Sequence, residues 1–416
     1  MMQSRSAFLR TSAAAAATAA GATLSVRAPA RAANPARPVV LGDDMFLNDA
    51  WRELRGRTVG IVTNPSGVTS LGESLVDAAH RNSEITVKAL FGPEHGIRGT
   101  VGAGEVVGSS TDEKTGLPVH SLYGPTRHPT KAMLDGIDVL LFDIQDVGAR
   151  PYTYVSTMAY VMEAAAQYGK DVWVLDRPNP IGGTQVEGPV LDPKFKSFIG
   201  LYPIPERHGM TVGELARLFN DHFGIGCTLR VISMQGWTRD MLWPDTGLRW
   251  VPTSPNIPYA RTALVYLATG LIDEAGVNNG IGTTRPFEYA GGYGYDPAAF
   301  RDALVTRHIP GIEFEPADWT PTHGFWANKT LHGVALNVTD PHTFPNVRTA
   351  VELLAAARAQ NKYHVATGHE QIMDRDWGTD TVRLALDAGT SPDAIIASWE
   401  PGIRAFKALR AKYLLY

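Results

Sequence analysis

Cysteine is almost absent from this chain of 416 residues, which contains Cys227 alone. A disulfide within the chain is therefore impossible, and a cysteine-ligated metal cluster is excluded. Because Cys227 lies just ahead of an expected strand, its position favours a buried structural thiol over a reactive one. An excess of one charge is also missing, since 38 basic and 42 acidic side chains leave a net charge of −4. The chain thus lacks the basic surface that nucleic acid binding needs.

Several motifs of common enzymes are missing too. The sequence has no P-loop, no Gly-x-Ser-x-Gly elbow and no His-Glu-x-x-His pair. We therefore expect neither a nucleotide cofactor nor a bound metal.

Residues 1–33 have the pattern of a cleavable export signal. Arg5 and Arg10 precede an Ala-rich stretch, and a small-residue cleavage site ends near Ala32. The segment resembles a twin-arginine signal, except that Ser6 stands where the second arginine is expected. It is short and only weakly apolar for a membrane anchor. We therefore expect an exported, periplasmic protein without stable membrane insertion.

Short apolar runs alternate with helical patterns from residue 58 onward. The expected strands cover 58–63, 85–90, 137–142, 171–175 and 229–232. The expected helices cover 71–81, 130–135, 153–168 and 212–222, the last opened by a capping box of Thr211 and Glu214. Such alternation is typical of an α/β fold with a parallel, doubly wound sheet.

A Trp/Pro-rich passage separates this pattern from the rest of the chain. We predict a catalytic domain at 34–236, a linker at 237–260 and a smaller auxiliary domain of α+β or α/β class at 261–416. In the auxiliary domain we expect helices at 261–275 and 346–360, a strand at 333–338, and a terminal helix pair opened by Ser391.

Polar motifs follow three of the expected strands. They are Phe91-Gly-Pro-Glu-His-Gly96, Asp143-Ile-Gln-Asp-Val-Gly-Ala-Arg150 and Asp176-Arg-Pro-Asn-Pro180. Ligands of parallel sheets bind outside the carboxyl ends of the strands. The three motifs therefore predict one active site at that edge.

Glu94 is the strongest candidate for a catalytic group, with His95 beside it. A carboxyl that is partly buried by Phe91 at a strand end suits a general acid. His95 would orient Glu94 or bind substrate, since adjacent residues rarely ligate one metal ion. The alternative is that Glu94 is an ordinary solvated loop residue.

Asp143, Gln145 and Asp146 form a second acidic cluster. In an extended segment Asp143 and Gln145 share one face and Asp146 points elsewhere. One aspartate would then be structural, paired with Arg150. The other would be a second carboxylate or would accept sugar hydroxyls, because two carboxylates about 5 to 9 Å apart carry out glycoside hydrolysis.

Further polar and aromatic residues are candidates for substrate binding, each with a structural alternative. Tyr152 and Tyr154 would stack on a sugar or pack in the core, and Asn179 and Glu187 would anchor substrate or hold turns. Arg207 and His208 lie near a helix N-terminus, which suits a carboxylate. The remaining candidates are Asn64, Arg98, Thr283, Arg285 and Glu288, of which the last three lie on a loop that would close over substrate or form a domain interface.

The ordered motifs resemble one bacterial family over 59–416. The resemblance rests on the three motifs above, together with Arg207-His-Gly-Met-Thr-Val-Gly-Glu-Leu215, Ser254-Pro-Asn-Ile-Pro258, Gly282-Thr-Thr-Arg-Pro-Phe-Glu288 and the closing Lys412-Tyr-Leu-Leu-Tyr416. The family includes the exo-β-N-acetylmuramidases of peptidoglycan recycling. The resemblance implies a Rossmann-like domain, an auxiliary domain, and an active site between them with Glu94 as the catalytic glutamate. It also implies release of N-acetylmuramic acid from the non-reducing end of glycan fragments.

Three hypotheses follow from the sequence. The first is an exo-glycosidase with Glu94 as general acid, in which the second carboxylate is Asp143, Asp146 or Glu187, or is replaced by the substrate's N-acetyl group. In this hypothesis Arg207 or Arg285 binds the lactyl carboxylate. The second is a metal-assisted hydrolase that uses His95, Asp143, Asp146 and His208. The third is a peptidoglycan-binding protein without catalytic activity.

Overall fold

The computed structural model of the chain describes residues 38–98 and 108–416. The predicted export signal at 1–33 lies outside the described residues. Within the described ranges, no helix is both long enough and apolar enough to cross a membrane.

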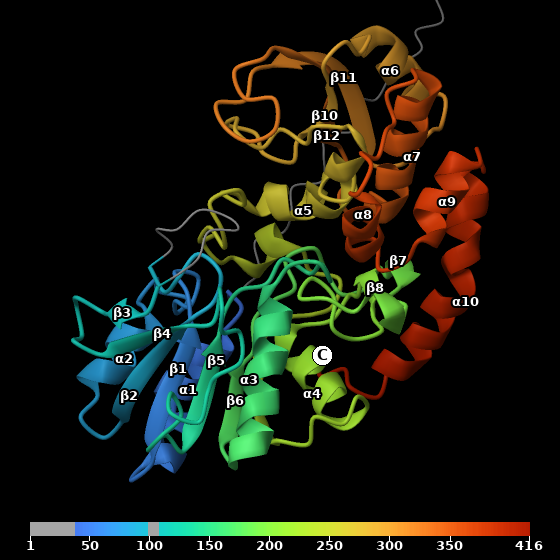
Figure 1. The fold of residues 1–416 in the computed structure, drawn as a ribbon. Coiled ribbons are helices and arrows are strands. Elements are labelled where there is room, and N and C mark those ends of the chain that lie inside the picture. The colour runs from blue at the N-terminus through green and yellow to red at the C-terminus, as the bar shows by residue number, and fades with distance from the viewer. Residues whose placement is uncertain (1–37, 99–107) are drawn as a thin grey trace, which may run out of the picture. The chain divides into compact units, whose positions relative to one another are not determined.

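The main sheet of the described chain has the strand order β3-β4-β2-β1-β5-β6-β9 (Figure 1). Its strands are β1 (Thr58–Thr63), β2 (Thr86–Gly92), β3 (Ser110–Thr111), β4 (Pro118–Ser121), β5 (Val139–Asp143), β6 (Asp171–Leu175) and β9 (Thr228–Ile232). All neighbouring strands are parallel except β3 and β4. The chain runs from β1 to β2 on one side and then resumes with β5 on the other. The switch point of the topology therefore lies between β1 and β5, which is where ligands bind in such sheets.

Helices cover both faces of this sheet. The helices are α1 (Gly42–Asn48), α2 (Leu75–Arg81), α3 (Tyr154–Tyr168) and α4 (Val212–Asp221), with a 3-10 turn at Ala50–Leu54. Adjacent residues of β5 face opposite sides of the sheet. Phe142 packs with α3 and α4 on one side, and Leu141 packs with α1 and α2 on the other. Side chains alternate along a strand, so an uninterrupted apolar run serves two cores at once. The predicted doubly wound α/β fold is confirmed.

The described residues after 236 form a second, smaller sheet with its own helices. The antiparallel strands β10 (Tyr289–Gly292), β12 (Leu331–Val338) and β11 (Ile312–Trp319) lie in that order. The helices are α5 (Ala260–Thr269), α6 (Pro297–Val305), α7 (Asn346–Ala359), α8 (Glu370–Asp376), α9 (Thr381–Asp387) and α10 (Pro392–Arg410), and the short strands β7 (Glu187–Val190) and β8 (Pro205–Arg207) pair separately. Further 3-10 turns lie at Pro193–Phe195, Trp243–Thr246 and Asp273–Ala275. Of the two classes predicted for this part of the chain, the antiparallel sheet with separate helices matches α+β.

Local chemistry explains which helix boundaries were predicted. Helix α3 ends at Gly169, which takes the left-handed conformation at φ 64° that glycine adopts at little cost. Helix α4 begins with the predicted capping box, in which Glu214 N donates to Thr211 Oγ1 at 3.2 Å and Thr211 N donates to Glu214 Oε2 at 3.0 Å. Both boundaries are therefore confirmed.

One other predicted helix is absent, and three others have different bounds or number. Residues 130–135 form turns only, and the helix expected at 71–81 begins at Leu75, after a turn in which Gly72 has φ 83°. The helix expected at 261–275 ends near Gly270. The terminal pair is one helix, α10, which continues through Pro401 while packing against β7.

The last residue of the chain packs on the main sheet. The Tyr416 hydroxyl donates to Asp176 Oδ2 at 2.8 Å and accepts from Met234 N at 2.8 Å. Its ring meets Trp237 edge-on at 5.2 Å. The predicted domain boundaries at 236 and 261 stay predictions, because the end of the chain closes back onto the predicted first domain.

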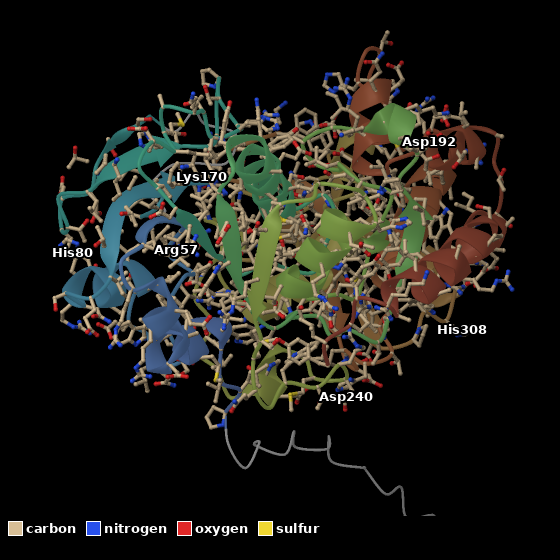
Figure 2. The ribbon with its side chains drawn as sticks, turned by 90° about the horizontal axis from the view of Figure 1, so that it is seen from below. Arg57, His80, Lys170, Asp192, Asp240 and His308 are labelled. Atoms are coloured by element: carbon tan, nitrogen blue, oxygen red, sulfur yellow. The ribbon has the colours of Figure 1, made fainter. Side chains whose placement is uncertain are left out.

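The amino ends of the strands carry ordinary surface charges. Figure 2 labels Arg57 and Lys170, which immediately precede β1 and β6. Arg57 Nη2 pairs with Asp171 Oδ2 at 2.7 Å, and both side chains are partly exposed. The buried charged side chains lie at the opposite end of the sheet, beyond the carboxyl ends of the strands.

Arg150 is one of these buried charges and joins distant segments. Its side chain is 1% exposed and forms an ion pair with Glu206. Its Nη2 also donates to the Asp376 carbonyl at 2.9 Å, and its backbone N donates to Glu206 O at 2.9 Å. The loop after β5 is thereby tied to β8 and α8. The expected pairing of Arg150 with an aspartate of its own motif was wrong.

Replacing Arg150 by Met should lower the free energy of unfolding by about 3 to 5 kcal/mol, because Glu206 would be left buried without its counter-charge. Urea denaturation at neutral pH measures the change. The control is Arg55→Met, which breaks the exposed ion pair with Glu84 and should cost less than about 1 kcal/mol. Equal effects of the two substitutions would contradict the role given to Arg150.

Candidate active site

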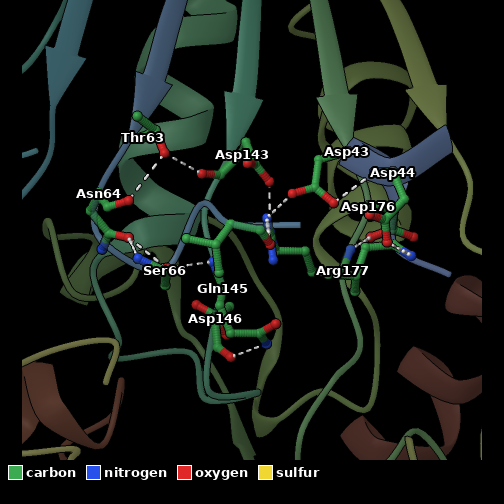
Figure 3. Close-up of polar contacts among 12 residues, drawn as sticks. Asp43, Asp44, Thr63, Asn64, Ser66, Asp143, Gln145, Asp146, Asp176 and Arg177 are labelled. Carbon is green, nitrogen blue, oxygen red and sulfur yellow. Dashed lines mark hydrogen bonds and ion pairs between the residues drawn. The ribbon is translucent and has the colours of Figure 1, made fainter. Parts of the chain in front are cut away.

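Four loops meet at the carboxyl ends of the parallel strands of the main sheet, which we call the carboxyl edge. They follow β1, β2, β5 and β6, and Figure 3 shows the polar side chains of three of them with Asp43 and Asp44 of α1. The sequence prediction that the motifs lie at one edge is therefore confirmed. Two separate groups of side chains occupy this edge, one around Glu94 and one around Arg177.

Glu94 lies half-buried among hydroxyl groups. Thr153 Oγ1 donates to Glu94 Oε2 at 2.8 Å. Thr153 is the residue before α3 and its hydroxyl makes no hydrogen bond to the helix backbone. Burial, followed by the charge of Glu94 and a hydrogen bond to it, raises the pKa of Tyr123 to about 12. The hydroxyls of Thr153 and Tyr123 thus hold the carboxylate from two elements.

The charge of this carboxylate also acts on two more tyrosines. Burial raises the pKa of Tyr154 well above its usual value, with smaller effects of Tyr152 and Glu94. Burial also raises the pKa of Tyr266, with smaller effects of Tyr152, acidic residues of the C-terminal part and Glu94. All of these phenols stay neutral near pH 7, so each can donate a hydrogen bond and none is activated as a nucleophile.

His95 has an unusual backbone conformation. Its φ of 69° lies in the left-handed region, as does the φ of 75° at Gly96, and its side chain is 5% exposed. Gly96 N donates to Pro93 O at 3.0 Å and closes the turn. A left-handed histidine costs about 1 kcal/mol. The surrounding structure therefore holds this turn, and with it the position of Glu94, against local strain.

Tyr152 and Tyr154 form part of the wall of the site. Tyr152 is 8% exposed and Tyr154 is 1% exposed, and their rings meet edge-on at 4.9 Å. The Tyr152 hydroxyl lies 2.7 Å from Thr253 Oγ1, and the Tyr154 hydroxyl donates to the Thr253 carbonyl. Their burial leaves little ring surface for stacking on a sugar and matches the packing alternative.

Arg177 organises the second group of side chains. Its Nε donates to Asp143 Oδ1 at 2.6 Å and its Nη2 donates to Asp43 Oδ2 at 2.7 Å (Figure 3). Burial raises the pKa of Asp143, and the Arg177 guanidinium opposes that rise. Asp143 is fully buried and paired, so we assign it a structural role.

Asp146 differs from Asp143 because it has no cationic partner in the described chain. Its Oδ1 accepts from Gly148 N at 2.7 Å, and burial raises its pKa to about 7. Its Oδ2 makes no hydrogen bond to any described residue. The charge of Asp146 also raises the pKa of the neighbouring Tyr152, after the larger effect of burial. Asp146 is therefore a carboxyl that can change protonation near neutral pH.

Amide and hydroxyl groups form a hydrogen-bonded network at the switch point between β1 and β5. Gln145 N donates to Ser66 Oγ at 3.0 Å, and Ser66 N donates to Asn64 Oδ1 at 2.9 Å. Gln145 Nε2 donates to the Asp146 and Pro178 carbonyls at 2.8 Å. A cavity of about 290 Å³ opens here, lined in part by Ser66, Gln145, Arg177, Trp243 and Arg249.

Four predicted substrate ligands are engaged inside the protein. Arg207, 1% exposed, pairs with Glu187 Oε1 at 2.7 Å, and Glu187 Oε2 accepts from Val347 N at 3.0 Å at the start of α7. Asn179 Oδ1 accepts from Ile181 N at 3.1 Å and so holds its own turn.

His208 is buried, and that burial, with Arg410 and two other arginines nearby, lowers its pKa to about 3. Its Nδ1 accepts from Met210 N at 3.1 Å.

The loop after residue 280 borders a different cavity. Arg285 Nε and Arg261 Nε both donate to Glu288 at 2.9 Å, and all three residues line a cavity of about 560 Å³. Thr283 Oγ1 donates to Gly280 O at 2.7 Å within the loop. Arg98 pairs with Asp112 at 2.9 Å and is part-exposed.

The proposed set of metal ligands is not gathered in the structure. Across 38–98 and 108–416, no three His, Cys, Asp or Glu side chains are grouped closely enough to hold an ion. Asp143 pairs with Arg177, and His208 accepts from Met210 N. The arrangement therefore gives the metal-assisted hypothesis no support.

Sequence reasoning did not select several residues of the site. Thr153 and Tyr266 resembled ordinary helix residues, and Tyr123 belongs to a strand end that was not predicted. Ser66 lies in a predicted loop, where its spacing of two from Asn64 permits a local side-chain turn. That spacing was the one usable signal.

Comparison with known proteins adds to this geometry. Residues 59–261 match the N-terminal domain, and residues 264–416 the C-terminal domain, of the family described as exo-beta-N-acetylmuramidase NamZ. The chain is 45% identical over 381 residues to the peptidoglycan beta-N-acetylmuramidase NamZ of Bacillus subtilis strain 168, covering 91% of each chain.

The chain belongs to this family.

Two solved structures share the fold. A DUF1343 family protein from Bacteroides fragilis is 35% identical, with a TM-score of 0.86, over 91% of this chain and 99% of that one. A second DUF1343 protein of the same organism is 31% identical, with a TM-score of 0.74 over the same shares. The resemblance drawn from the motifs is confirmed.

The raised pKa of Asp146 predicts a pH dependence of stability. A carboxyl with a higher pKa in the folded than in the unfolded chain loses stability as pH rises from about 4, its unfolded pKa, to about 7. Asp146→Asn keeps the acceptor for Gly148 N but carries no titrating proton. The variant should therefore gain stability relative to the parent between about pH 5 and about pH 8.

Urea denaturation at the two pH values measures this change, with the same substitution at the exposed Asp135 as control. A constant difference between Asp146→Asn and the parent would contradict the assignment.

Proposed function

We propose that the chain is an exo-acting glycoside hydrolase that releases N-acetylmuramic acid from the non-reducing end of peptidoglycan fragments. Membership of the exo-β-N-acetylmuramidase family supports the substrate class. The observation that carries the chemistry is the half-buried Glu94 at the carboxyl edge, held by Thr153 Oγ1 at 2.8 Å. We also propose export to the periplasm, which rests on the pattern of residues 1–33 alone.

In this proposal Glu94 donates a proton to the glycosidic oxygen as the bond to the leaving sugar breaks. General acids of this kind contribute about 10²- to 10⁴-fold to the rate. The neutral tyrosines beside Glu94 would limit the access of water, with the Tyr154 proton donated to the Thr253 carbonyl and the Tyr123 hydroxyl bonded to Glu94. They do not act as the nucleophile, because burial raises the pKa values of Tyr154 and Tyr266 well above that of a free phenol.

The proposal also needs a second catalytic group, for which the sequence offered Asp143, Asp146 and Glu187. Asp143 holds Arg177, and Glu187 holds Arg207 and the start of α7. These contacts leave Asp146 as the protein carboxyl among the three, with the substrate's own N-acetyl group as the alternative. Of the two arginines proposed for the lactyl carboxylate, Arg285 is the more accessible, since its side chain is 34% exposed and that of Arg207 is 1% exposed.

Glu94→Gln should lower kcat/KM on the disaccharide of N-acetylmuramic acid and N-acetylglucosamine by at least about 100-fold, because the amide cannot donate the acidic proton. Product release is followed by chromatography, and thermal unfolding checks that the variant is folded. Chelator-treated parent enzyme should keep its activity. Parent turnover that survives in Glu94→Gln would exclude Glu94 as the acid, and binding without any turnover by the parent would favour a non-catalytic glycan-binding protein.

Thr153→Val tests how Glu94 is positioned. A hydrogen bond to a charged group is worth about 1.5 to 3 kcal/mol, so kcat/KM should fall about 10- to 100-fold. The pH profile of the rate should shift as well, because the removed hydroxyl stabilises the ionised carboxylate. Thr153→Ser keeps the hydroxyl and should restore most of the activity. An unchanged pH profile in Thr153→Val would show that the contact is structural only.

A further inference from the structure

An aromatic pocket lies in the C-terminal part of the chain, outside the group around Glu94. Its volume is about 560 Å³, and its wall includes Tyr293, Phe325 and Trp326. Tyr293 is 67% exposed and Phe325 is 64% exposed, which is unusual for large apolar side chains. Large exposed rings gathered at one pocket indicate a binding surface.

The backbone holds these rings in place. Trp326 has φ 63° and follows Gly324 at φ 81°, so the loop has a conformation that side chains disfavour. Trp326 packs on Gly292, where an added Cβ would lie 2.8 Å from the indole. The pocket is therefore built in advance of binding.

Buried amides anchor the same loop from below. Asn278 is 6% exposed, and its Oδ1 accepts from Trp319 Nε1 at 2.9 Å. Its Nδ2 donates to the Phe325 carbonyl at 3.4 Å. The loop that carries Phe325 is thus fixed to the second sheet by the Asn278 side chain, whose Oδ1 also accepts from Gly280 N at 2.9 Å.

The rim of the pocket is polar. His369 Nδ1 lies 2.8 Å from Glu274 Oε2, within hydrogen-bonding distance, and both residues line the pocket together with Lys362 and Asn279. Aromatic faces bordered by hydrogen-bonding groups suit a pyranose ring, whose C–H face packs on an aromatic ring while its hydroxyl and acetamido groups reach the rim. An apolar peptide would instead leave the rim charges desolvated.

The pocket is connected to the catalytic group through α5. Thr153 holds Glu94, and the neighbouring Tyr152 packs edge-on against Tyr266 of α5 at 5.7 Å. The turn that follows α5 carries Asp273 and Glu274 of the pocket wall. A glycan that has one sugar at Glu94 would extend along α5 toward these rings.

We propose that the pocket lined by Tyr293, Phe325 and Trp326 is a saccharide-binding subsite that holds a second sugar of the glycan substrate. The inference rests on the proposed function for the identity of the ligand. It assigns to this pocket the recognition of glycan length, separate from the bond-breaking step.

The test compares a long and a short ligand. In the full chain, Tyr293→Ala and Phe325→Ala should each weaken binding of a peptidoglycan-derived tetrasaccharide to the Glu94→Gln protein about tenfold, equivalent to about 1.4 kcal/mol. Calorimetry measures that binding. With Glu94 intact, the same substitutions should change kcat/KM for an aryl glycoside of N-acetylmuramic acid less than twofold. Phe325→Tyr should restore tetrasaccharide binding, since it keeps an aromatic face.

The control is Leu384→Ala, which removes another exposed apolar side chain, 51% exposed, in α9 and should change neither property. Unchanged tetrasaccharide binding in both alanine variants would overturn the subsite, as would equal losses on the long and the short ligand. A parent that binds the tetrasaccharide through these rings but hydrolyses neither substrate would overturn the proposed function and leave the subsite standing.

Discussion

The position of Arg177 between Asp43 and Asp143 is the constraint on which the carboxyl edge depends. All three side chains are almost completely buried, at distances of 2.7 and 2.6 Å. A charge taken out of water is tolerated only with a partner and further hydrogen bonds, and Arg177 supplies both by also donating to the Val68 carbonyl at 3.0 Å. The guanidinium therefore joins α1 and the loops after β1, β5 and β6, and fixes where the switch point opens.

This arrangement divides the acidic side chains into two kinds. Those bound to arginines, such as Asp143 and Glu206, hold loops together and are removed from solvent. Glu94 accepts a hydrogen bond from the Thr153 hydroxyl and stays half-buried. A half-buried carboxyl can be reached by a substrate, which a general acid requires. The geometry of Glu94 thus agrees with the role proposed for it.

The sequence predicted the sheet and the edge on which the site lies, because buried parallel strands are continuous apolar runs and the polar motifs begin where those runs end. It did not predict the partners. Arg150 was expected to pair within its own motif, yet it pairs with Glu206, and Arg207 was expected to bind substrate, yet it pairs with Glu187. Such pairings join segments far apart in the chain, and spacing along a sequence contains no information on them. Residues 130–135 form turns instead of the expected short helix, although Leu134 is fully buried in the core, because so short a segment gains few helical hydrogen bonds to offset the cost of nucleation.

The most direct test of the account is the dependence of Glu94→Gln on the leaving group. The variant and the parent are compared on the natural disaccharide and on a dinitrophenyl glycoside of N-acetylmuramic acid, whose leaving group departs without protonation. If Glu94 is the general acid, the variant loses at least about 100-fold on the disaccharide and retains most of its activity on the dinitrophenyl glycoside. Equal losses on the two substrates would show that Glu94 does not protonate the leaving group and would contradict the account.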